Sequence, residues 1–426
     1  MRPYHLAVLL MLSSACDADC DPASLTCSGF TRSSPAPQAP DASFEGVCEE
    51  RDCVPIAIAA GAQHTCASIL HDFVGSTAEG ETVCWGRNDH HQVGPGDDAV
   101  VLRPQRSPFG FSYSLDASAL HTCAVDPPFL GCWGSNAAGM LGWPFAEDTY
   151  AKQLPFYQAG YPYEVALGAA HACTLDDGHD APKVRCFGDN AFDQLGEVED
   201  PYLALRGSWI TLPGDVLAMD AEGLRTCVWS ASEGLLCWGR EHADHEPGEV
   251  PWAVPGVSDP EVIALGASHA CVIEDGAVRC WGSNVHGELG LGRRGERTSA
   301  PGEAVPLPAP ARAVAVGGWI PVEATSLVEI SYGEPSPAHT CALLENGEVW
   351  CWGANDRGQL GDGTTDDRMA PARVPLDWAS SISAGGAHTC AIAGTSIHCW
   401  GANDHGQLGV DPGALPFSAS PVLFEL

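Results

Sequence analysis

Short apolar stretches alternate with turn residues along most of the chain, and the clearest of them predict β-hairpins. The segment from Cys271 to Cys280 has Asp275 and Gly276 at its centre, a pair that strongly favours a two-residue hairpin turn. A turn at this point places Cys271 directly opposite Cys280. The pattern therefore predicts an antiparallel hairpin that carries one cysteine on each strand.

This hairpin recurs seven times, and each copy ends in Cys, an aromatic residue and Gly. Consecutive side chains of a strand point to opposite faces, so the second Cys and the aromatic residue after it lie on opposite faces of the sheet. Both faces are then apolar, and each sheet must pack between two others. Repeats of about 50 residues are typical of small units stacked in an array. The pairs are Cys66 and Cys84, Cys123 and Cys132, Cys173 and Cys186, Cys227 and Cys237, Cys271 and Cys280, Cys341 and Cys351, and Cys390 and Cys399.

Further motifs recur around the hairpins. A histidine stands two residues before the first Cys in six copies, four times as Gly-x-x-His, and Trp-Gly-x-Asn and Gly-Gln-Leu-Gly motifs follow the second Cys. Together these motifs resemble the regulator of chromosome condensation repeat in its Cys-rich bacterial form, over about residues 54 to 426. The resemblance implies an all-β fold, a seven-bladed β-propeller of four-stranded antiparallel blades.

The fourth copy is the weakest, because Arg225 replaces the histidine and Glu241 replaces the asparagine. We still expect it to form a blade, since its two cysteines and Trp238 are present. The chain starts the first repeat at Val54 and ends near Ser420 to Phe424, in a stretch that resembles the strand missing before Val54. We therefore expect the two ends to share one blade, which removes the exposed sheet edges.

The facing cysteines predict one disulfide in each blade. Directly opposed residues of an antiparallel pair come within about 4.5 Å between Cα atoms, a separation that a disulfide can bridge. Zinc is the alternative, but there is no Cys-x-x-Cys knuckle and each site would need ligands from elsewhere. Nineteen cysteines also favour an oxidising compartment.

The amino terminus predicts export. Residues 1–15 read as a signal peptide with a short apolar run, and the small residues before Cys16 resemble a lipobox, so we expect Cys16 to be lipidated. Residues 16–53 are rich in Pro and Ala and read as a tether to the propeller, residues 54–426. The pairing of Cys20, Cys27, Cys48 and Cys53 stays open. The expected location is the cell envelope, at the outer membrane or cell surface, with plain secretion as the alternative.

The formal charge of −35, from 20 Lys and Arg against 55 Asp and Glu, excludes a basic footprint for nucleic acid and disfavours anionic lipid surfaces. It leaves cationic partners and divalent ions open, although solubility alone is the simpler reading. We expect a monomer that touches the membrane through its lipid anchor only.

Candidate chemistry is sparse. The six repeated histidines should form a ring whose hydrogen bonds fix the first turn of each blade, although a ring around a channel can also bind metal: His64, His121, His171, His269, His339 and His388. Asp362 to Asp367 has carboxylates at loop spacing but lacks the Glu of an EF-hand, so calcium stays open. No catalytic motif is present, and we expect no enzyme activity, no cofactor and no metal.

Two insertions interrupt the repeat. One lengthens the hairpin between Cys66 and Cys84, and the other runs from Trp319 to Tyr332 before the sixth hairpin. Because loops on a rigid frame commonly carry binding, we take Trp319, Ile320 and Tyr332 as a candidate binding loop that overhangs one rim with its aromatic residues exposed. A tolerated insertion without a role is the alternative.

These features predict an extracytoplasmic, lipid-anchored interaction protein that binds another protein or a cell-surface polymer with the loops of one propeller face. Relatives of the resembled family also include inhibitors of extracellular enzymes and nucleotide exchange factors for small GTPases. The first alternative fits an exported protein, whereas the second implies a cytosolic partner, which export makes improbable.

Overall fold

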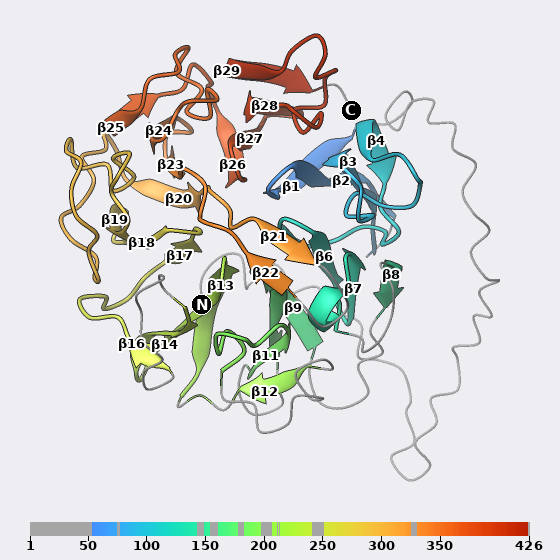
Figure 1. Ribbon diagram of the computed structural model, residues 1–426, viewed down its shortest axis with the longest axis horizontal. Helices are drawn as coiled ribbons and strands as arrows, with labels where there is room; N and C mark the ends of the chain where they lie inside the picture. Colours follow the sequence, from blue (N-terminus) through green and yellow to red (C-terminus); the bar gives the residue numbers. More distant parts are fainter. Residues whose placement is uncertain are drawn as a thin grey trace.

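The computed structural model describes residues 53–74, 77–142, 149–153, 161–177, 183–196, 207–210, 212, 214–240, 251–324 and 330–424. Seven antiparallel sheets surround a central axis as the blades of a propeller (Figure 1). The prediction of an all-β, seven-bladed β-propeller is therefore confirmed. The predicted signal peptide, Cys16 and the tether up to residue 52 lie outside the described residues.

Each blade is a meander that starts at the axis and ends at the rim. The first blade contains β1 (Val54–Ala60), β2 (His64–Val74), β3 (Thr77–Arg87) and β4 (Val100–Arg106). The second contains β5 (Ser114–Ala117), β6 (His121–Asp126), β7 (Phe129–Gly134) and β8 (Thr149–Gln153). The third contains β9 (Tyr161–Leu167), β10 (His171–Asp177), β11 (Lys183–Gly188) and β12 (Ser208–Ile210). The weak fourth copy also forms a blade, as predicted, with β13 (Val216–Glu222), β14 (Arg225–Ser230), β15 (Gly234–Gly239) and β16 (Trp252–Ala253).

The last three blades follow the same order. The fifth contains β17 (Val262–Leu265), β18 (His269–Glu274) and β19 (Ala277–Gly282), and two bridges, Arg279 to Ala304 and Gly282 to Thr298, take the place of its fourth strand. The sixth contains β20 (Ala311–Val316), β23 (His339–Leu344), β24 (Val349–Gly353) and β25 (Arg368–Arg373). The seventh contains β26 (Ala379–Ala384), β27 (His388–Ala393), β28 (Ser396–Ala402) and β29 (Phe417–Phe424). A separate hairpin, β21 (Val322–Ala324) and β22 (Ile330–Tyr332), lies between β20 and β23 in the chain.

The core is divided among the seven interfaces between blades, each filled by its own apolar cluster. At the interface of the seventh and first blades, Trp85 packs with Cys390 and Cys399, whereas Cys66 and Cys84 of the same hairpin pack against the second blade. The Cys and Trp side chains therefore lie on opposite faces of the sheet, as the sequence pattern predicts.

The ring does not close through a shared blade, so that prediction is wrong. The first blade is built from β1 to β4 and the seventh from β26 to β29, each from one continuous segment. The two blades instead meet face to face, where the rings of Trp85 and Phe424 stack at 4.2 Å between centroids. Burial of this apolar interface, rather than exchange of a strand, joins the ends of the chain.

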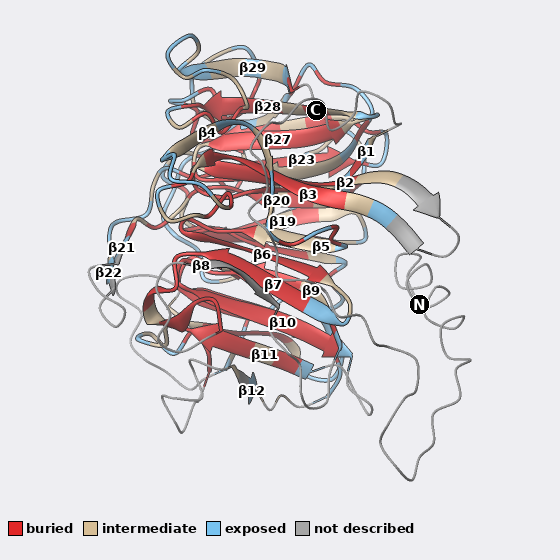
Figure 2. Ribbon diagram, turned by 90° about the vertical axis from the view of Figure 1, so that its right-hand side faces the viewer, coloured by how far each residue is buried: buried red, intermediate tan, exposed pale blue. Residues whose placement is uncertain are grey.

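The two faces of the propeller differ (Figure 2). We call the upper face the one that carries β21 and β22, together with the turns between the first and second strands of each blade. The lower face is the opposite one, where the innermost strands begin and where the turns between the second and third strands lie. Residue 53 joins the propeller at the lower face.

Candidate functional site

The insertion before the sixth hairpin lies across the propeller axis on the upper face (Figure 1). Ile320 and Val322 are 7% and 9% exposed, and they pack on small residues at the upper ends of the innermost strands, among them Ala119 and Ala169. The prediction that this segment overhangs a rim is wrong. The alanines around the axis form an apolar surface, and the insertion buries its own apolar residues there.

Trp319 and Tyr332 are partly buried, so the prediction that they are exposed is also wrong. The Tyr332 hydroxyl donates to Asp189 Oδ2 at 2.6 Å, and the Tyr332 ring meets Phe192 edge to face at 5.6 Å. Asp189 and Phe192 belong to the third blade, so the insertion ties the sixth blade to the third. Its role as a binding loop stays a prediction, with Glu323 among its exposed residues.

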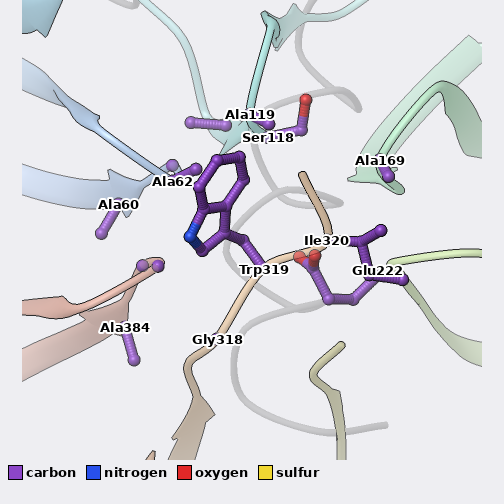
Figure 3. A pocket seen from close by; sticks show the side chains of 14 residues that line it. Ala60, Ala62, Ser118, Ala119, Ala169, Glu222, Gly318, Trp319, Ile320 and Ala384 are labelled. Carbon is purple, nitrogen blue, oxygen red and sulfur yellow. The ribbon is translucent and has the colours of Figure 1, made fainter. Parts of the chain in front are cut away.

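A small cavity lies beneath the insertion (Figure 3). Trp319 and Ile320 cover it, and Glu222, Ser118 and several alanines line it. The cavity has room for about one water molecule. It is therefore too small for an organic ligand.

Four carboxyl groups stand on the innermost strands of the second, third and fourth blades: Asp116, Glu164, Asp220 and Glu222. Asp116 Oδ2 accepts the Leu167 N–H at 2.7 Å, and Asp220 Oδ2 accepts the Leu265 N–H at 2.6 Å. Each of these two carboxylates thus satisfies a backbone donor on the innermost strand of the next blade. In the seventh blade Ser383 does the same, because its Oγ accepts the Ala60 N–H.

These four residues stand on the innermost strands and are partly buried. Burial, together with the charge of Asp220, raises the pKa of Asp116 to about 8 and that of Glu164 to about 7. Burial raises the pKa of Asp220 to about 7, and burial with the charge of Asp116 raises the pKa of Glu222 well above its usual value. Sequence reasoning missed this group. For Asp116 and Asp220 the available signal is an Asp opposite the first Cys of the blade, where four blades have Ala and the seventh has Ser383.

The repeated histidines are fully buried and join neighbouring blades. His64 Nε2 lies 2.8 Å from Thr122 Oγ1 of the next blade, and four further pairs repeat the contact: His171 with Thr226, His269 with Thr340, His339 with Thr389 and His388 with Thr65. Each threonine hydroxyl donates to a carbonyl in the preceding blade, as Thr122 does to Gln92, so the histidine donates to the threonine. The predicted bond to the first turn is therefore wrong for these five. Burial lowers the pKa of each to about 3, so the rings are neutral.

His121 is the exception, and its partners explain why. The next blade has Ala172 at the position where the other five histidines meet a Thr, so His121 Nε2 has no partner. Its Nδ1 instead lies 2.8 Å from Ser118 Oγ, in its own first turn. Ser118 occupies the position of the Gly in Gly-x-x-His, where a side chain at Gly168 would collide with the His171 ring.

The loops after the second cysteine supply the acceptors for this contact between blades. Trp85 Nε1 and Thr65 Oγ1 both donate to the carbonyl of Gln407. Sequence reasoning missed the equivalent loop of the first blade, His91 to Gly94, and Asn190 of the third. In the first of these, His91 adopts a φ of 62° where the motif has Gly. The available sequence signal was His91-Gln-Val-Gly94 in place of Gly-Gln-Leu-Gly, since His tolerates a positive φ better than most residues other than Gly.

The seven predicted cysteine pairs are each brought to disulfide distance. In every pair the Cα atoms are 4.0 to 4.1 Å apart, and the two cysteines face one another across the second and third strands of their blade. The register of the hairpins, set by the turn between the strands, accounts for this. The facing pairs are Cys66 with Cys84, Cys123 with Cys132, Cys173 with Cys186, Cys227 with Cys237, Cys271 with Cys280, Cys341 with Cys351, and Cys390 with Cys399.

The spacing between paired cysteines varies, but the facing position is kept. The separation is 9 residues from Cys123 to Cys132, 10 from Cys227 to Cys237 and from Cys341 to Cys351, and 13 from Cys173 to Cys186. Loops of different length between the second and third strands thus absorb the difference. The cysteines at 20, 27 and 48 lie outside the described residues.

The loop from Asp362 to Asp367 uses its carboxylates internally. Asp362 accepts hydrogen bonds from Thr364 and Arg368, and Asp367 is paired with Arg294. Within the described ranges no group of three or more His, Cys, Asp or Glu residues has a metal-binding arrangement, and no described helix is long and apolar enough to cross a membrane.

The lower face carries an arc of exposed apolar side chains. Each lies at or next to the start of an innermost strand, in five blades that adjoin one another from the seventh to the fourth. Their exposed fractions are 79% for Trp378, 37% for Val54, 46% for Tyr113, 58% for Tyr161 and 51% for Leu217. We call these five residues the lower-face arc. Sequence reasoning missed it, because a large apolar residue at a strand start is ordinarily read as core.

Comparison with known proteins agrees with this architecture. Residues 346–392 match the Regulator of chromosome condensation (RCC1) repeat. The chain is 29% identical to the Ultraviolet-B receptor UVR8 of Arabidopsis thaliana, over 65% of this chain and 62% of that protein. It is 27% identical to the mitochondrial RCC1 domain-containing protein RUG3 of the same plant, over 72% of this chain and 74% of that one. These matches and the seven-bladed propeller support an RCC1-repeat family protein.

A solved structure of an RCC1-repeat propeller shows the same fold. Prp20p from Saccharomyces cerevisiae, described with its binding properties to Gsp1p and histones, matches 78% of this chain and 80% of its own, with a TM-score of 0.61 at 19% identity. The likeness at this identity extends to the fold alone. The RCC1-repeat frame is a protein-interaction fold whose relatives include exchange factors and regulators.

Proposed function

We propose that this RCC1-repeat protein is an exported interaction protein that binds another protein or a cell-surface polymer through its lower face. The observation that carries the proposal is the lower-face arc, because its exposed apolar side chains lie at or next to the starts of innermost strands in five adjoining blades and are not scattered singly over the surface. The frame behind them is held by seven packed interfaces, which suits a preformed binding surface. Catalysis is not part of the proposal.

The compartment rests on the cysteines and the amino terminus. Cysteine pairs at disulfide distance in every blade favour an oxidising environment. We propose that residues 1–15 direct export, that Cys16 is lipidated and that residues 16–53 tether a monomeric propeller to the envelope. The substitution Cys16→Ser should then release the protein from membranes, with Cys20→Ser as the matched control; equal membrane association of both would contradict the anchor.

Capture of the partner tests the proposal. Full-length protein, cross-linked on intact cells and recovered by an affinity tag, should carry a partner that is lost in the variant Tyr113→Ala/Tyr161→Ala/Trp378→Ala. A control variant, Val285→Ala/Met369→Ala/Leu423→Ala, removes exposed apolar residues outside the arc and should retain it. Retention of the partner by both variants would place binding elsewhere on the propeller and overturn the proposal.

A further inference from the structure

The chemistry of the lower-face arc indicates what it binds. Three of its five residues are aromatic, and Tyr113 stands on the buried Phe111 in an edge-to-face contact of 5.0 Å. The flat faces of Tyr and Trp attract cations such as the guanidinium group of Arg. An arc of this composition suits a ligand that combines cationic and apolar groups.

Trp378 is exposed in spite of an unfavourable backbone conformation. It has a φ of 60°, a conformation that is strained for a bulky side chain, and it is 79% exposed. Gly347 holds this turn, because its carbonyl accepts the Ala379 N–H and because a side chain at this position would press against the Trp378 backbone. The fold thus tolerates backbone strain at Trp378 although its exposed indole buries little surface and contributes little stability.

Carboxylates accompany the aromatic residues. Asp177 stands directly across from Tyr161 in the pair of β9 and β10, and Asp215 lies two residues before Leu217. Asp126 is close enough to Tyr113 to help raise the pKa of its phenol, although burial is the larger cause. Asp377, next to Trp378, is already paired with Arg373. The formal charge of −35 extends the same preference over the whole molecule.

We infer that the lower-face arc binds a cationic segment of a partner polypeptide, whose Lys or Arg side chains lie on Tyr113, Tyr161 and Trp378 and pair with Asp126 and Asp177. This inference rests on the proposed function and specifies its ligand. Apolar residues of the segment contact Leu217 and Val54. An anionic bilayer is disfavoured at this face, since it would bring lipid phosphates against the carboxylates.

Peptide binding tests the inference. A fluorescein-labelled peptide of alternating Arg and Leu should bind the full chain at physiological ionic strength, measured by fluorescence anisotropy, and an alternating Glu and Leu peptide should not. The variant Tyr113→Ala/Tyr161→Ala/Trp378→Ala should weaken binding about tenfold or more, because aromatic anchors dominate such contacts. The off-arc control Val285→Ala/Met369→Ala/Leu423→Ala should stay within about twofold.

A second pair of variants separates a site from general charge attraction. Asp126→Asn/Asp177→Asn should weaken binding clearly more than Asp97→Asn/Asp98→Asn, which removes two exposed charges from the upper face. Equal effects of the two acid pairs, together with no effect of the aromatic variant, would reduce the attraction to net charge and overturn the inference. Stronger binding to phosphatidylglycerol vesicles than to the Arg and Leu peptide would overturn it as well.

Trp378→Gly provides an independent readout. Glycine accepts a φ of 60° without strain, and this gain offsets the entropy that glycine adds to the unfolded chain. The variant should therefore unfold at about the same temperature while losing affinity for the peptide. A loss of affinity accompanied by a lower unfolding temperature would mean that Trp378 supports the fold and would contradict its role as a contact. If cell-surface capture depends on the arc but the peptide does not bind, the cationic ligand is wrong and the proposed function stands.

Discussion

His388 Nε2 and Thr65 Oγ1 lie 2.9 Å apart although 323 residues separate them in the chain. The contact joins the seventh blade to the first. The Thr65 hydroxyl in turn donates to the Gln407 carbonyl of the seventh blade at 3.0 Å. The same contact recurs between neighbouring blades elsewhere in the ring. Closure of the propeller therefore uses the contact that also holds consecutive blades together.

Removal of this hydroxyl should loosen the closure. Thr65→Val keeps the shape of the side chain but leaves the buried His388 Nε2 without its acceptor, so we expect a loss of about 1–3 kcal/mol in the free energy of unfolding. Denaturant titration measures it.

The complementary change supplies its control. Ala172→Thr gives the unpaired His121 Nε2 a partner at the equivalent place and should stabilise the protein by about 0.5–1.5 kcal/mol. A destabilised Ala172→Thr variant would contradict the role of this threonine position.

The stacked pair at the closing interface makes a second prediction. Phe424 is 4% exposed and packs on Trp85, so Phe424→Ala should lower the free energy of unfolding by about 3–5 kcal/mol. The neighbouring Leu423 is 49% exposed, and Leu423→Ala should change stability by no more than about 0.5 kcal/mol. If Phe424→Ala costs no more free energy of unfolding than Leu423→Ala, the stack of Phe424 on Trp85 does not contribute to closure.

Two sets of buried titratable groups should make the free energy of unfolding depend on pH in opposite directions. The pKa of each of the six buried histidines is lowered to about 3. Below about pH 6.5 the unfolded chain therefore binds protons at these histidines that the folded chain does not, and stability falls as the pH drops. The raised pKa values of Asp116, Glu164 and Asp220 act oppositely, because the folded chain holds protons that the unfolded one releases. From these groups, stability falls as the pH rises from about 4 towards 8.

The two sets largely offset each other between about pH 4 and 6.5, and only the carboxyl groups titrate from there to about pH 8. The unfolding temperature should therefore be lower at pH 8 than at pH 6.5, as scanning calorimetry can measure. Asp116→Asn/Asp220→Asn should flatten this decline, because an amide oxygen can still accept the Leu167 and Leu265 N–H groups. An unfolding temperature that rises between pH 6.5 and 8 would contradict the assignment.

The insertion across the axis should come loose without unfolding the blades. Ile320→Asp places a charge in an apolar contact at the upper face, so amide hydrogen exchange should speed up in β21 and β22 while the second strands of the blades keep their protection. Glu323→Gln, at an exposed position of the same segment, is the control and should leave exchange unchanged. Faster exchange throughout the sixth blade would instead make the insertion part of its core.

The hairpin pattern could be predicted because all seven copies keep the two Cys residues, the aromatic residue and the Gly. The facing of Cys271 and Cys280 follows from the Asp275–Gly276 turn, and the opposite placement of Cys and Trp follows from strand alternation. Contacts between distant segments were not readable in this way. The stack of Phe424 on Trp85 and the course of Trp319 over the axis depend on which apolar surface lies nearby in space, and the periodicity of the chain does not contain that information.

In the candidate site, too, local features could be predicted from the sequence and contacts between blades could not. The histidines were located from the repeat, but their partners stand on other blades, and the lower-face arc is assembled from single residues at strand starts such as Tyr161 and Trp378. Those residues match no motif, because they face solvent and the repeat is set by what is buried.

Photo-cross-linking from both faces tests the central claim most directly. Benzoylphenylalanine placed at Tyr161 or Trp378 samples the lower face, and the same probe at Glu323 or Ser331 samples the upper face, all at accessible positions. Irradiation in the native compartment should give a specific cross-linked partner from the two lower positions and none from the two upper ones. A partner cross-linked only from Glu323 or Ser331 would assign binding to the insertion and contradict the account.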